Sequence, residues 1–423
     1  MIWFQLGREY KLSVAEILAV FPYGKTVYLG KDFLILENID KENVLSKANT
    51  LWWTIKIIEI IDSTIVDEAL KSEWKFKYWI SIFWEKKNLK SILIWIKKEL
   101  KENNISSRFV NKDFTNLSSA QILGEHLLKS ESDYSYVYIK NPSPSIALQG
   151  LPLNLREENN WKYYIWKTIW VQDIYNYSKR DYEKDRDMQT GMLPPKLCQM
   201  MINIACIQNP SPSVALQGLP LTSKEEKNKE QVIYDPFVWL WTVLIESILM
   251  WNKSIYWSDL SDIMVEKSIS NINWFVKDHN LDLENNKIIK LNAKFIHESE
   301  ILLNKKIDSI VTEWYLWEMM TQKNISIERI NKQKESLLEL YDRFFEWLKK
   351  IHYEWNIVIC FPFWEMNTKY IYFTEIYDLL NKHCNIESMF SIQNEVETTK
   401  AGSLLYKRDK QLVWREIFKL SLK

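Results

Sequence analysis

The residues best suited to chemistry lie in one stretch, VIYDPFVWLWTVLIESILMWNKSIYWSD, from Val232 to Asp259. Its pattern predicts a strand, a tight turn, a helix, a second strand and a closing acid, at residues 232–234, Asp235, 242–250, 254–256 and Asp259. Such a βαβ unit typically binds the adenosine end of a nucleotide-like cofactor. N–H groups at the start of the helix face the ligand, and the acid accepts hydrogen bonds from the ribose. The stretch therefore predicts a cofactor site.

This unit has tryptophan at places where glycine is expected, at Trp239, Trp241 and Trp257. Only a residue without Cβ turns so tightly and lets a ligand touch its backbone. The chain has 8 glycines and 21 tryptophans, which sum to 29, whereas a typical protein of this length has roughly 30 glycines. We therefore predict that most of the tryptophans are UGA codons that the source organism reads as glycine. TGG codons at the three positions would exclude this.

The alternative interpretation is a protein that is truly rich in tryptophan and uses it at an interface. The tryptophans fall at predicted turns and loops rather than on one face of a periodic element. That distribution favours glycine.

Length and composition predict a cytoplasmic protein of two or three domains. The 423 residues are 47% apolar, and 55 basic residues balance 55 acidic ones. The four cysteines form no CxxC pair and no cluster with the five histidines, so we expect neither a metal site nor a disulfide framework. Charges come too early for a signal peptide, and the longest apolar run, 236–251, is too short to span a membrane.

One segment is locally basic. Residues 74–129 carry eleven Lys or Arg against five Asp or Glu, a net charge of +6, together with aromatic residues. This composition favours a surface for the RNA backbone, and a merely solvated basic face is the alternative. The candidate RNA-binding residues are Lys97, Lys98, Lys101, Arg108 and Lys112.

The N-terminal part is predicted as a small α/β module over residues 1–70 and an RNA-binding module over 71–140. In the first module a helix is expected from Ser13 to Val20, with Ser13 as N-cap and Glu16 completing a capping box. In the second, Ser118 or Ser119 is expected to cap a short helix.

A repeated sequence interrupts the chain twice. NPSPSIALQGLPL at 141–153 recurs as NPSPSVALQGLPL at 209–221. The first copy, in a linker over 141–160, splits an expected hairpin between YSYVYIK and KYYIWKT. We interpret both copies as insertions in surface loops, the second within 207–230, because lengthening a loop costs little free energy. A proline motif that docks a partner is the alternative.

Residues 161–423 are predicted to form the catalytic half. Strands alternate with helices, and the final segment, 411–422, is expected to be an antiparallel strand. This order predicts an α/β fold with a doubly wound sheet.

Once tryptophan is replaced by glycine, the chain resembles the THUMP-containing tRNA guanine-10 N2-methyltransferases. The resemblance covers nearly the whole chain outside the two insertions, and DPFxGxGTxLIE and GMLPPKL are its most specific motifs. The segments that carry it are FQLGREYKLSVAEILAVF, LWWTIKI, SRFV with LSSAQI, VQDIYNYSKRDYEKDRD with GMLPPKL, DPFVWLWTVLIE, YWSDLS, IVTEWYLWE and LVWREIFK.

The resemblance implies an N-terminal α+β THUMP-like RNA-binding region, a Rossmann-like methyltransferase domain, S-adenosylmethionine as cofactor and tRNA as partner. Asp259 matches the ribose-binding acid, Asn292 and Ala293 match the pair beside the adenine, and Gly191, Leu193 and Pro195 match a turn that closes over the cofactor. The residues that match the cofactor loop are Asp235, Phe237, Trp239, Trp241 and Thr242.

The chain departs from these relatives after its fourth catalytic strand. Amino-methylating relatives carry (Asp/Asn)-Pro-Pro-(Tyr/Phe) there, whereas this chain has Thr312, Glu313, Trp314 and Tyr315. Glu313 is expected to accept a hydrogen bond from the exocyclic amine, and Tyr315 to stack on the base. If Glu313 has no such role, Asp173 and Asp187 are the next candidates.

The implied function is methyl transfer from S-adenosylmethionine to the N2 amine of a tRNA guanine. The first alternative is an adenine-N6 methyltransferase acting on DNA or RNA, which the catalytic half alone does not exclude. The second is a non-catalytic RNA-binding protein, which would follow if the tryptophans are real and an indole fills the cofactor cleft.

Overall fold

The computed structural model describes most of the chain outside the two inserted repeats. Five predicted site residues lie outside the described residues: Lys112, Gly191, Trp239, Trp241 and Tyr315. The described residues are 1–60, 65–72, 75–83, 89–111, 116–125, 127–128, 133–140, 163–164, 166–175, 193–206, 231–237, 242–250, 254–279, 287–293, 307–313, 320–351, 356–390, 396–408 and 411–423.

The chain divides into two compact units. The first comprises residues 1–14 and 23–182, and the second comprises residues 15–22 and 183–423. Within the described residues, no helix is both long enough and apolar enough to cross a membrane.

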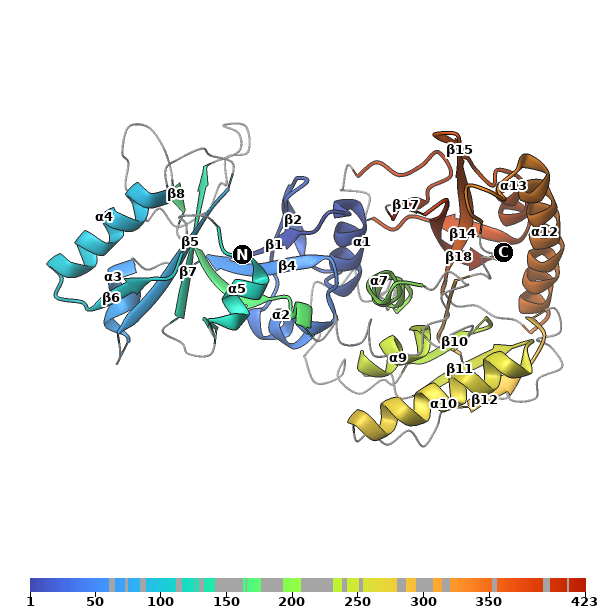
Figure 1. Ribbon diagram of the computed structural model, residues 1–423, viewed down its shortest axis with the longest axis horizontal. Helices are drawn as coiled ribbons and strands as arrows, with labels where there is room; N and C mark the ends of the chain where they lie inside the picture. The colour runs from blue at the N-terminus through green and yellow to red at the C-terminus, as the bar shows by residue number, and fades with distance from the viewer. Residues whose placement is uncertain are drawn as a thin grey trace, which may run out of the picture. The chain divides into compact units, whose positions relative to one another are not determined.

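The first unit is built on a nine-stranded mixed sheet with the strand order β2-β3-β1-β4-β9-β7-β5-β6, and β8 pairs with β7 (Figure 1). Its strands are β1 (Ile2–Leu6), β2 (Lys25–Leu29), β3 (Phe33–Glu37), β4 (Thr54–Ile60), β5 (Phe76–Phe83), β6 (Ser107–Phe109), β7 (Asp133–Lys140), β8 (Tyr163–Tyr164) and β9 (Trp166–Val171). Its helices are the start of α1 (Tyr10–Val20), which passes into the second unit after residue 14, α2 (Lys41–Lys47), η1 (Ala48–Thr50), α3 (Ile65–Leu70), α4 (Leu89–Glu102) and α5 (Ser119–Gly124).

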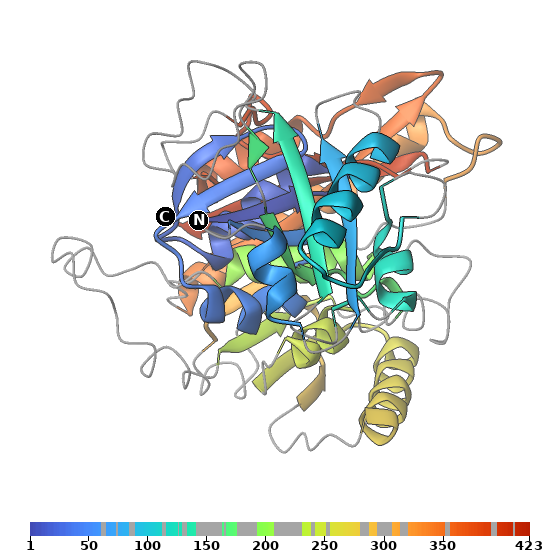
Figure 2. The same ribbon diagram turned by 90° about the vertical axis from the view of Figure 1, so that its left-hand side faces the viewer.

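Strand β5 carries buried side chains on both of its faces. Successive side chains of a strand point to opposite faces. Phe76, Tyr78 and Ile80 pack against α3 and α4, whereas Trp79 packs in a cluster with Ile122 of α5. Figure 2 shows α4 running alongside this part of the sheet.

Several predictions for the first unit are confirmed. The hairpin split by the first repeat forms, since Ile139 of β7 pairs with Tyr164 of β8. Ser118 caps α5 and forms a capping box with Gln121.

Two local predictions are wrong. Helix α1 begins at Tyr10, so Ser13 lies inside it and donates a hydrogen bond from Oγ to the Trp53 carbonyl (3.0 Å) instead of capping the helix. Glu16 is fully buried and accepts a hydrogen bond from Asn203 Nδ2 (2.8 Å), so it does not complete a capping box.

The boundary between the halves also differs from the prediction. Strand β9 was expected in the catalytic half, which was predicted to start at residue 161. It pairs with β4 and β7 in the first sheet, and the first unit continues to residue 182. The regions predicted as 1–70 and 71–140 share this one sheet.

The second unit is a doubly wound α/β fold, as predicted. Its main sheet has the strand order β12-β11-β10-β13-β14-β18-β16, with β15 beside β14 and β17 beside β18. The strands from β12 to β14 are parallel, and the terminal strand β18 is antiparallel to β14. The strands are β10 (Val232–Asp235), β11 (Ser254–Asp259), β12 (Lys287–Lys290), β13 (Ser309–Glu313), β14 (Asn356–Met366), β15 (Lys369–Ile371), β16 (Cys384–Glu387), β17 (Leu404–Tyr406) and β18 (Val413–Leu422).

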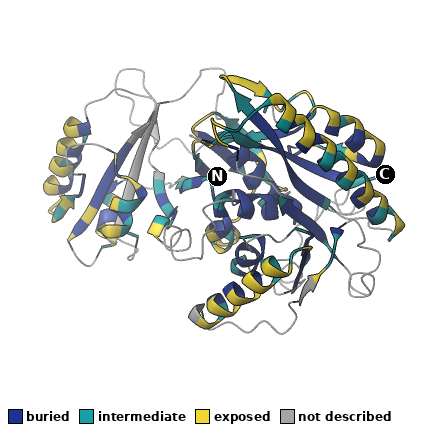
Figure 3. Ribbon diagram, turned by 45° about the vertical axis from the view of Figure 1, so that its right-hand side comes forward, coloured by how far each residue is buried: buried dark blue, intermediate teal, exposed yellow. Residues whose placement is uncertain are grey.

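Helices cover both faces of this sheet. Figure 1 shows α12 (Ile327–Lys350) and α13 (Glu375–His383) on one side and α7 (Pro195–Ala205) on the other. Helices α9 (Thr242–Leu249) and α10 (Asp262–His279) pack against β11. In Figure 3 the central strands of this sheet are buried between helices whose outer faces are exposed.

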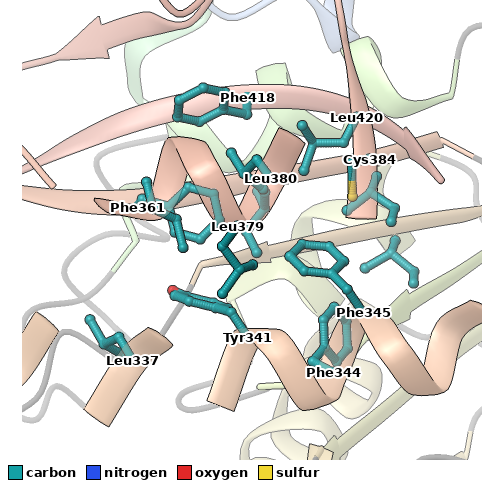
Figure 4. Packing of buried hydrophobic residues seen from close by; sticks show 14 of the residues in the cluster. Leu337, Tyr341, Phe344, Phe345, Phe361, Leu379, Leu380, Cys384, Phe418 and Leu420 are labelled. Atoms are coloured by element: carbon teal, nitrogen blue, oxygen red, sulfur yellow. The ribbon is translucent and has the colours of Figure 1, made fainter. Parts of the chain in front are cut away.

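The core beneath α12 and α13 is aromatic. Tyr341 lies edge-on to Phe361 with ring centroids 4.7 Å apart, and Phe361 in turn meets Phe418 at 5.6 Å (Figure 4). This core fixes β14, which lies beside β13, and β18, which lies on the far side of β14.

We expect that removing residues 141–153 and 209–221 together leaves the fold intact. Nine residues, 154–162, would still join β7 to β8, and the entropy of a shortened loop changes stability by only about 1 kcal/mol. The free energy of urea-induced unfolding measures this. The control keeps both lengths but scrambles the order of the 13 residues in each copy. A deletion variant that fails to fold while the scrambled chain folds would show that the repeats are structural.

Candidate functional site

The predicted site residues at the ends of β10 and β13 come together at the carboxyl edge of the parallel strands. Thr312 Oγ1 donates a hydrogen bond to Asp235 Oδ1 at 2.7 Å, and both residues are buried. The Phe237 backbone N–H donates to the same oxygen at 3.1 Å. Strands β10 and β13 lie where the strand order reverses, and open α/β sheets bind ligands at this switch point.

Among the acids of this edge, Asp235 has the most strongly raised pKa. Burial raises its pKa to about 7, and the nearby charges of Asp259 and Glu313 act in the same direction, while the hydrogen bonds from Thr312 and Phe237 oppose them. Three carboxyl groups therefore share one partly desolvated edge, and a cationic ligand there would relieve their repulsion.

The raised pKa of Asp235 predicts a pH-dependent cost to stability. Between about pH 4 and pH 7 the folded chain keeps a proton that the unfolded chain has released, so stability falls over this range and is level above it. Asp235→Asn keeps the acceptor oxygen and removes this cost. We expect it to gain on the order of 3 kcal/mol over the wild type at pH 8 and almost nothing at pH 4.5. Urea unfolding of both proteins at the two pH values measures the gain. An equal difference in unfolding free energy at both pH values would contradict the raised pKa of Asp235.

The predicted ribose-binding acid ends β11. Asp259 is 9% exposed, and its Oδ1 accepts a hydrogen bond from the Ser261 N–H at 2.9 Å. Its carbonyl accepts from the Leu291 N–H at 3.0 Å, which brings the segment after β12 to the same edge. Asn292 is half-buried there, and Ala293 is buried in the core cluster that contains Ile310.

Glu313, the predicted amine acceptor, is the last residue of β13 and makes a buried ion pair. Arg415 Nε of β18 donates to Glu313 Oε1 at 2.5 Å, and the two side chains are 1% and 11% exposed. Burial raises the pKa of Glu313, and the charge and hydrogen bond of Arg415 lower it. Sequence reasoning missed Arg415, although a charged pair, Arg-Glu, inside the apolar end of the chain was the available signal.

Other predicted residues border the undescribed parts of the site. Leu193 and Pro195 are buried at the start of α7, and Thr242 is the first residue of α9. The Phe237 ring packs 5.9 Å from Phe344 of α12, so its side chain contributes to the core.

The alternative acid Asp173 belongs to the first unit, where its Oδ1 accepts a hydrogen bond from the Tyr175 N–H at 3.0 Å. The other alternative, Asp187, lies outside the described residues.

The tryptophans are distributed differently from the prediction. Among the twelve described, seven lie in strands and three in helices, whereas Trp52 and Trp53 occupy a turn. No described tryptophan has a positive φ angle. The premise that they sit at turns and loops is therefore wrong for this part of the chain, and the argument for glycine rests on Trp239 and Trp241, which lie outside the described residues.

Trp257 gives one argument for glycine, from the unsatisfied N–H donor of its indole. It is 1% exposed, pairs in register with Asp235 and packs between α9 and α10. Its buried Nε1 has no hydrogen-bond acceptor among the described residues, which costs about 1 to 3 kcal/mol. Glycine would remove that cost, but it would also leave a cavity in this core, and truncating a buried tryptophan costs about 3 to 5 kcal/mol.

Four of the predicted RNA-binding cations lie on one exposed region of the first unit. Lys97, Lys98 and Lys101 project from α4, and Arg108 lies on the adjacent β6. Lys97 Nζ lies 5.6 Å from the centroid of the Phe109 ring. Lys98 is paired loosely with Glu102 at 3.7 Å. This part of the basic segment is exposed, as a nucleic-acid surface requires.

Comparison with known proteins gives similarities of structure. No protein family profile and no curated protein matches the sequence. TrmN from Thermus thermophilus aligns over 100% of both chains with 10% identity and a TM-score of 0.43. Precorrin-6y C5,15-methyltransferase from Geobacter metallireducens aligns over 57% of this chain and 96% of its own, with 12% identity and a TM-score of 0.31. TrmK from M. capricolum, in complex with S-adenosylhomocysteine, aligns over 46% and 63%, with 14% identity and a TM-score of 0.28.

Proposed function

We propose that the chain is an S-adenosylmethionine-dependent tRNA methyltransferase that modifies the exocyclic N2 amine of a guanine. The observation that carries the proposal is the arrangement of Asp235, Thr312 and Glu313 at the switch point of a doubly wound sheet. The motif resemblance in the same residues supplies the reaction class.

The charge of the site fits this cofactor. S-adenosylmethionine is cationic at its sulfonium and its amino group, and it supplies an electrophilic methyl group when bound. Asp259, together with Asp235 in its ionised form, provides compensating negative charge at the carboxyl edge, whereas the charge of Glu313 is paired with Arg415. Asp259 has the position of the acid that accepts hydrogen bonds from the ribose.

Glu313 is the residue that we assign to the substrate base. A carboxylate oxygen accepts a hydrogen bond from an aryl amine and orients its lone pair toward the methyl group. Positioning of this kind supplies most of the rate in methyl transfer, because no strong general base is needed. Tyr315, two residues further, is the proposed stacking partner of the base.

The first unit is the proposed RNA-binding part. Lys97, Lys101 and Arg108 are exposed within a segment of positive net charge, and contacts to phosphate supply most of the affinity in nucleic-acid binding. The affinity for tRNA should therefore fall steeply with salt.

An assay with labelled S-adenosylmethionine tests the proposal. Unmodified tRNA and double-stranded DNA are each incubated with the full chain, and their nucleosides are separated by mass analysis. Label in N2-methylguanosine from tRNA is the expected result. Label in N6-methyladenine from either substrate would replace the proposal with its enzymatic alternative. RNA binding without any transfer, under conditions in which the cofactor binds, would favour the non-catalytic alternative.

A further inference from the structure

The buried ion pair at the end of β13 spans three strands. Arg415 of β18 pairs in register with Pro362 of β14, and Glu313 of β13 pairs with Cys360 of β14. The two charged residues are therefore two strand spacings apart, about 10 Å. Only a long side chain crosses β14 to reach Glu313.

Neighbouring strands hold Arg415 in place. β18 pairs with β14 on one edge, and Arg415 also pairs in register with Tyr406 of β17. Its Nη1 lies 3.4 Å from Gln411 Oε1. The direction from which the guanidinium meets Glu313 is thus set by the sheet.

Stability alone does not explain a charge at this position. Ile417 and Phe418, two and three residues further along β18, are fully buried and apolar, although Glu416 beside Arg415 is also buried. Replacing a buried ion pair by apolar residues is often neutral or stabilising, because the desolvation of two charges offsets their attraction. The role of the Arg415 charge therefore concerns the carboxylate that it contacts, that of Glu313.

Glu313 needs a partner to stay ionised. It is almost buried, and it lies close enough to Asp235 for their charges to interact. Without a nearby cation, burial and a second carboxylate would favour its protonated form. A protonated carboxyl donates its proton to a hydrogen bond and is a poorer acceptor for an amine.

We infer that Arg415 is a positioning residue: it fixes Glu313 Oε1 and keeps the carboxylate ionised, so that Oε2 accepts the hydrogen bond from the substrate amine. Among the residues that the structure describes, no group donates a hydrogen bond to Glu313 Oε2. The inference rests on the proposed function, since the amine belongs to the proposed substrate.

Two Arg415 variants test the inference, with Lys334→Met as control. Lys334 is another cation with a 9% exposed side chain, and it pairs with Glu375 on the same unit. Arg415→Met should lower kcat roughly tenfold, with the KM for tRNA within about a factor of three. It should also shift the acidic limb of the pH–rate profile to higher pH. Arg415→Lys should restore part of the rate and part of the profile, because it returns the charge without the fork of donors. Lys334→Met should leave the profile unchanged.

A direct titration of Glu313 completes the test and needs no substrate. The chain is labelled with ¹³C at glutamate carboxyls, and Glu313→Gln identifies the signal. Arg415→Met should raise the pKa of Glu313. An unmoved titration and an unmoved pH profile in a folded Arg415→Met or Arg415→Lys protein would overturn the inference and leave the proposed function standing. A wild type that binds the cofactor but never methylates RNA would overturn both.

Discussion

A chain with glycine at positions 239, 241 and 257 is expected to bind S-adenosylmethionine at least a hundredfold more tightly, on the order of 3 kcal/mol, than the chain with tryptophan. Two of these positions lie between β10 and α9 in the sequence, outside the described residues, where the motif predicts a turn whose backbone N–H groups face the ligand. The third, Trp257, lies next to Asp235 in the sheet. We expect indoles at 239 and 241 to occupy space that the cofactor needs and glycine to free it, whereas Trp257 packs in the core between α9 and α10.

Titration calorimetry on both chains measures the difference. The matched control carries glycine at Trp95, Trp274 and Trp347, all of which lie in helices. It should not gain affinity, and it should lose stability by up to about 1 kcal/mol for each substitution. Equal affinity of the tryptophan and glycine chains would refute the argument from the turn. TGG codons at the three positions would refute the prediction that the organism reads them as glycine, without any experiment on the protein.

Glu313→Gln is expected to lower the rate of methyl transfer at least roughly tenfold, or about 1.4 kcal/mol, with cofactor affinity nearly unchanged. The amide keeps the shape of the side chain, but it loses the charge that pairs with Arg415 and that orients the amine. The alanine variant is a poorer test, because it also removes the oxygen that accepts the hydrogen bond from Arg415 Nε.

Single-turnover rates and calorimetry measure the two effects separately. Glu375→Gln serves as the control, because it removes the same charge from a pair at the surface of the same unit. If Glu313→Gln abolished cofactor binding, or kept the full rate, Glu313 would not be the amine acceptor.

The catalytic half was largely predictable from its sequence. Both strands begin where predicted, at Val232 and Ser254, because short β-branched runs next to an apolar helical run form a local signal, but they extend further, to Asp235 and Asp259. The alternation of strands and helices sufficed for the doubly wound fold.

The errors arose where distant contacts override local patterns. Ser13 has the sequence signature of an N-cap, yet its hydroxyl bonds to a carbonyl 40 residues away. Strand β9 follows the first repeat closely in sequence, but its pairing with β4 assigns it to the first sheet.

The candidate site was predictable only in part, for the same reason. Asp235, Thr312 and Glu313 follow two predicted strands, so their proximity could be inferred from the parallel sheet. The ion pair between Glu313 and Arg415 joins residues 102 positions apart, and only the structure brings them together.

The central claim is that this chain methylates guanine in tRNA, and nucleoside analysis of tRNA from cells lacking the gene tests it most directly. The claim predicts that N2-methylguanosine falls at one or a few tRNA positions, and that the wild-type gene restores it while the Glu313→Gln gene does not. An unchanged content of N2-methylguanosine in every tRNA of the deletion strain would contradict it.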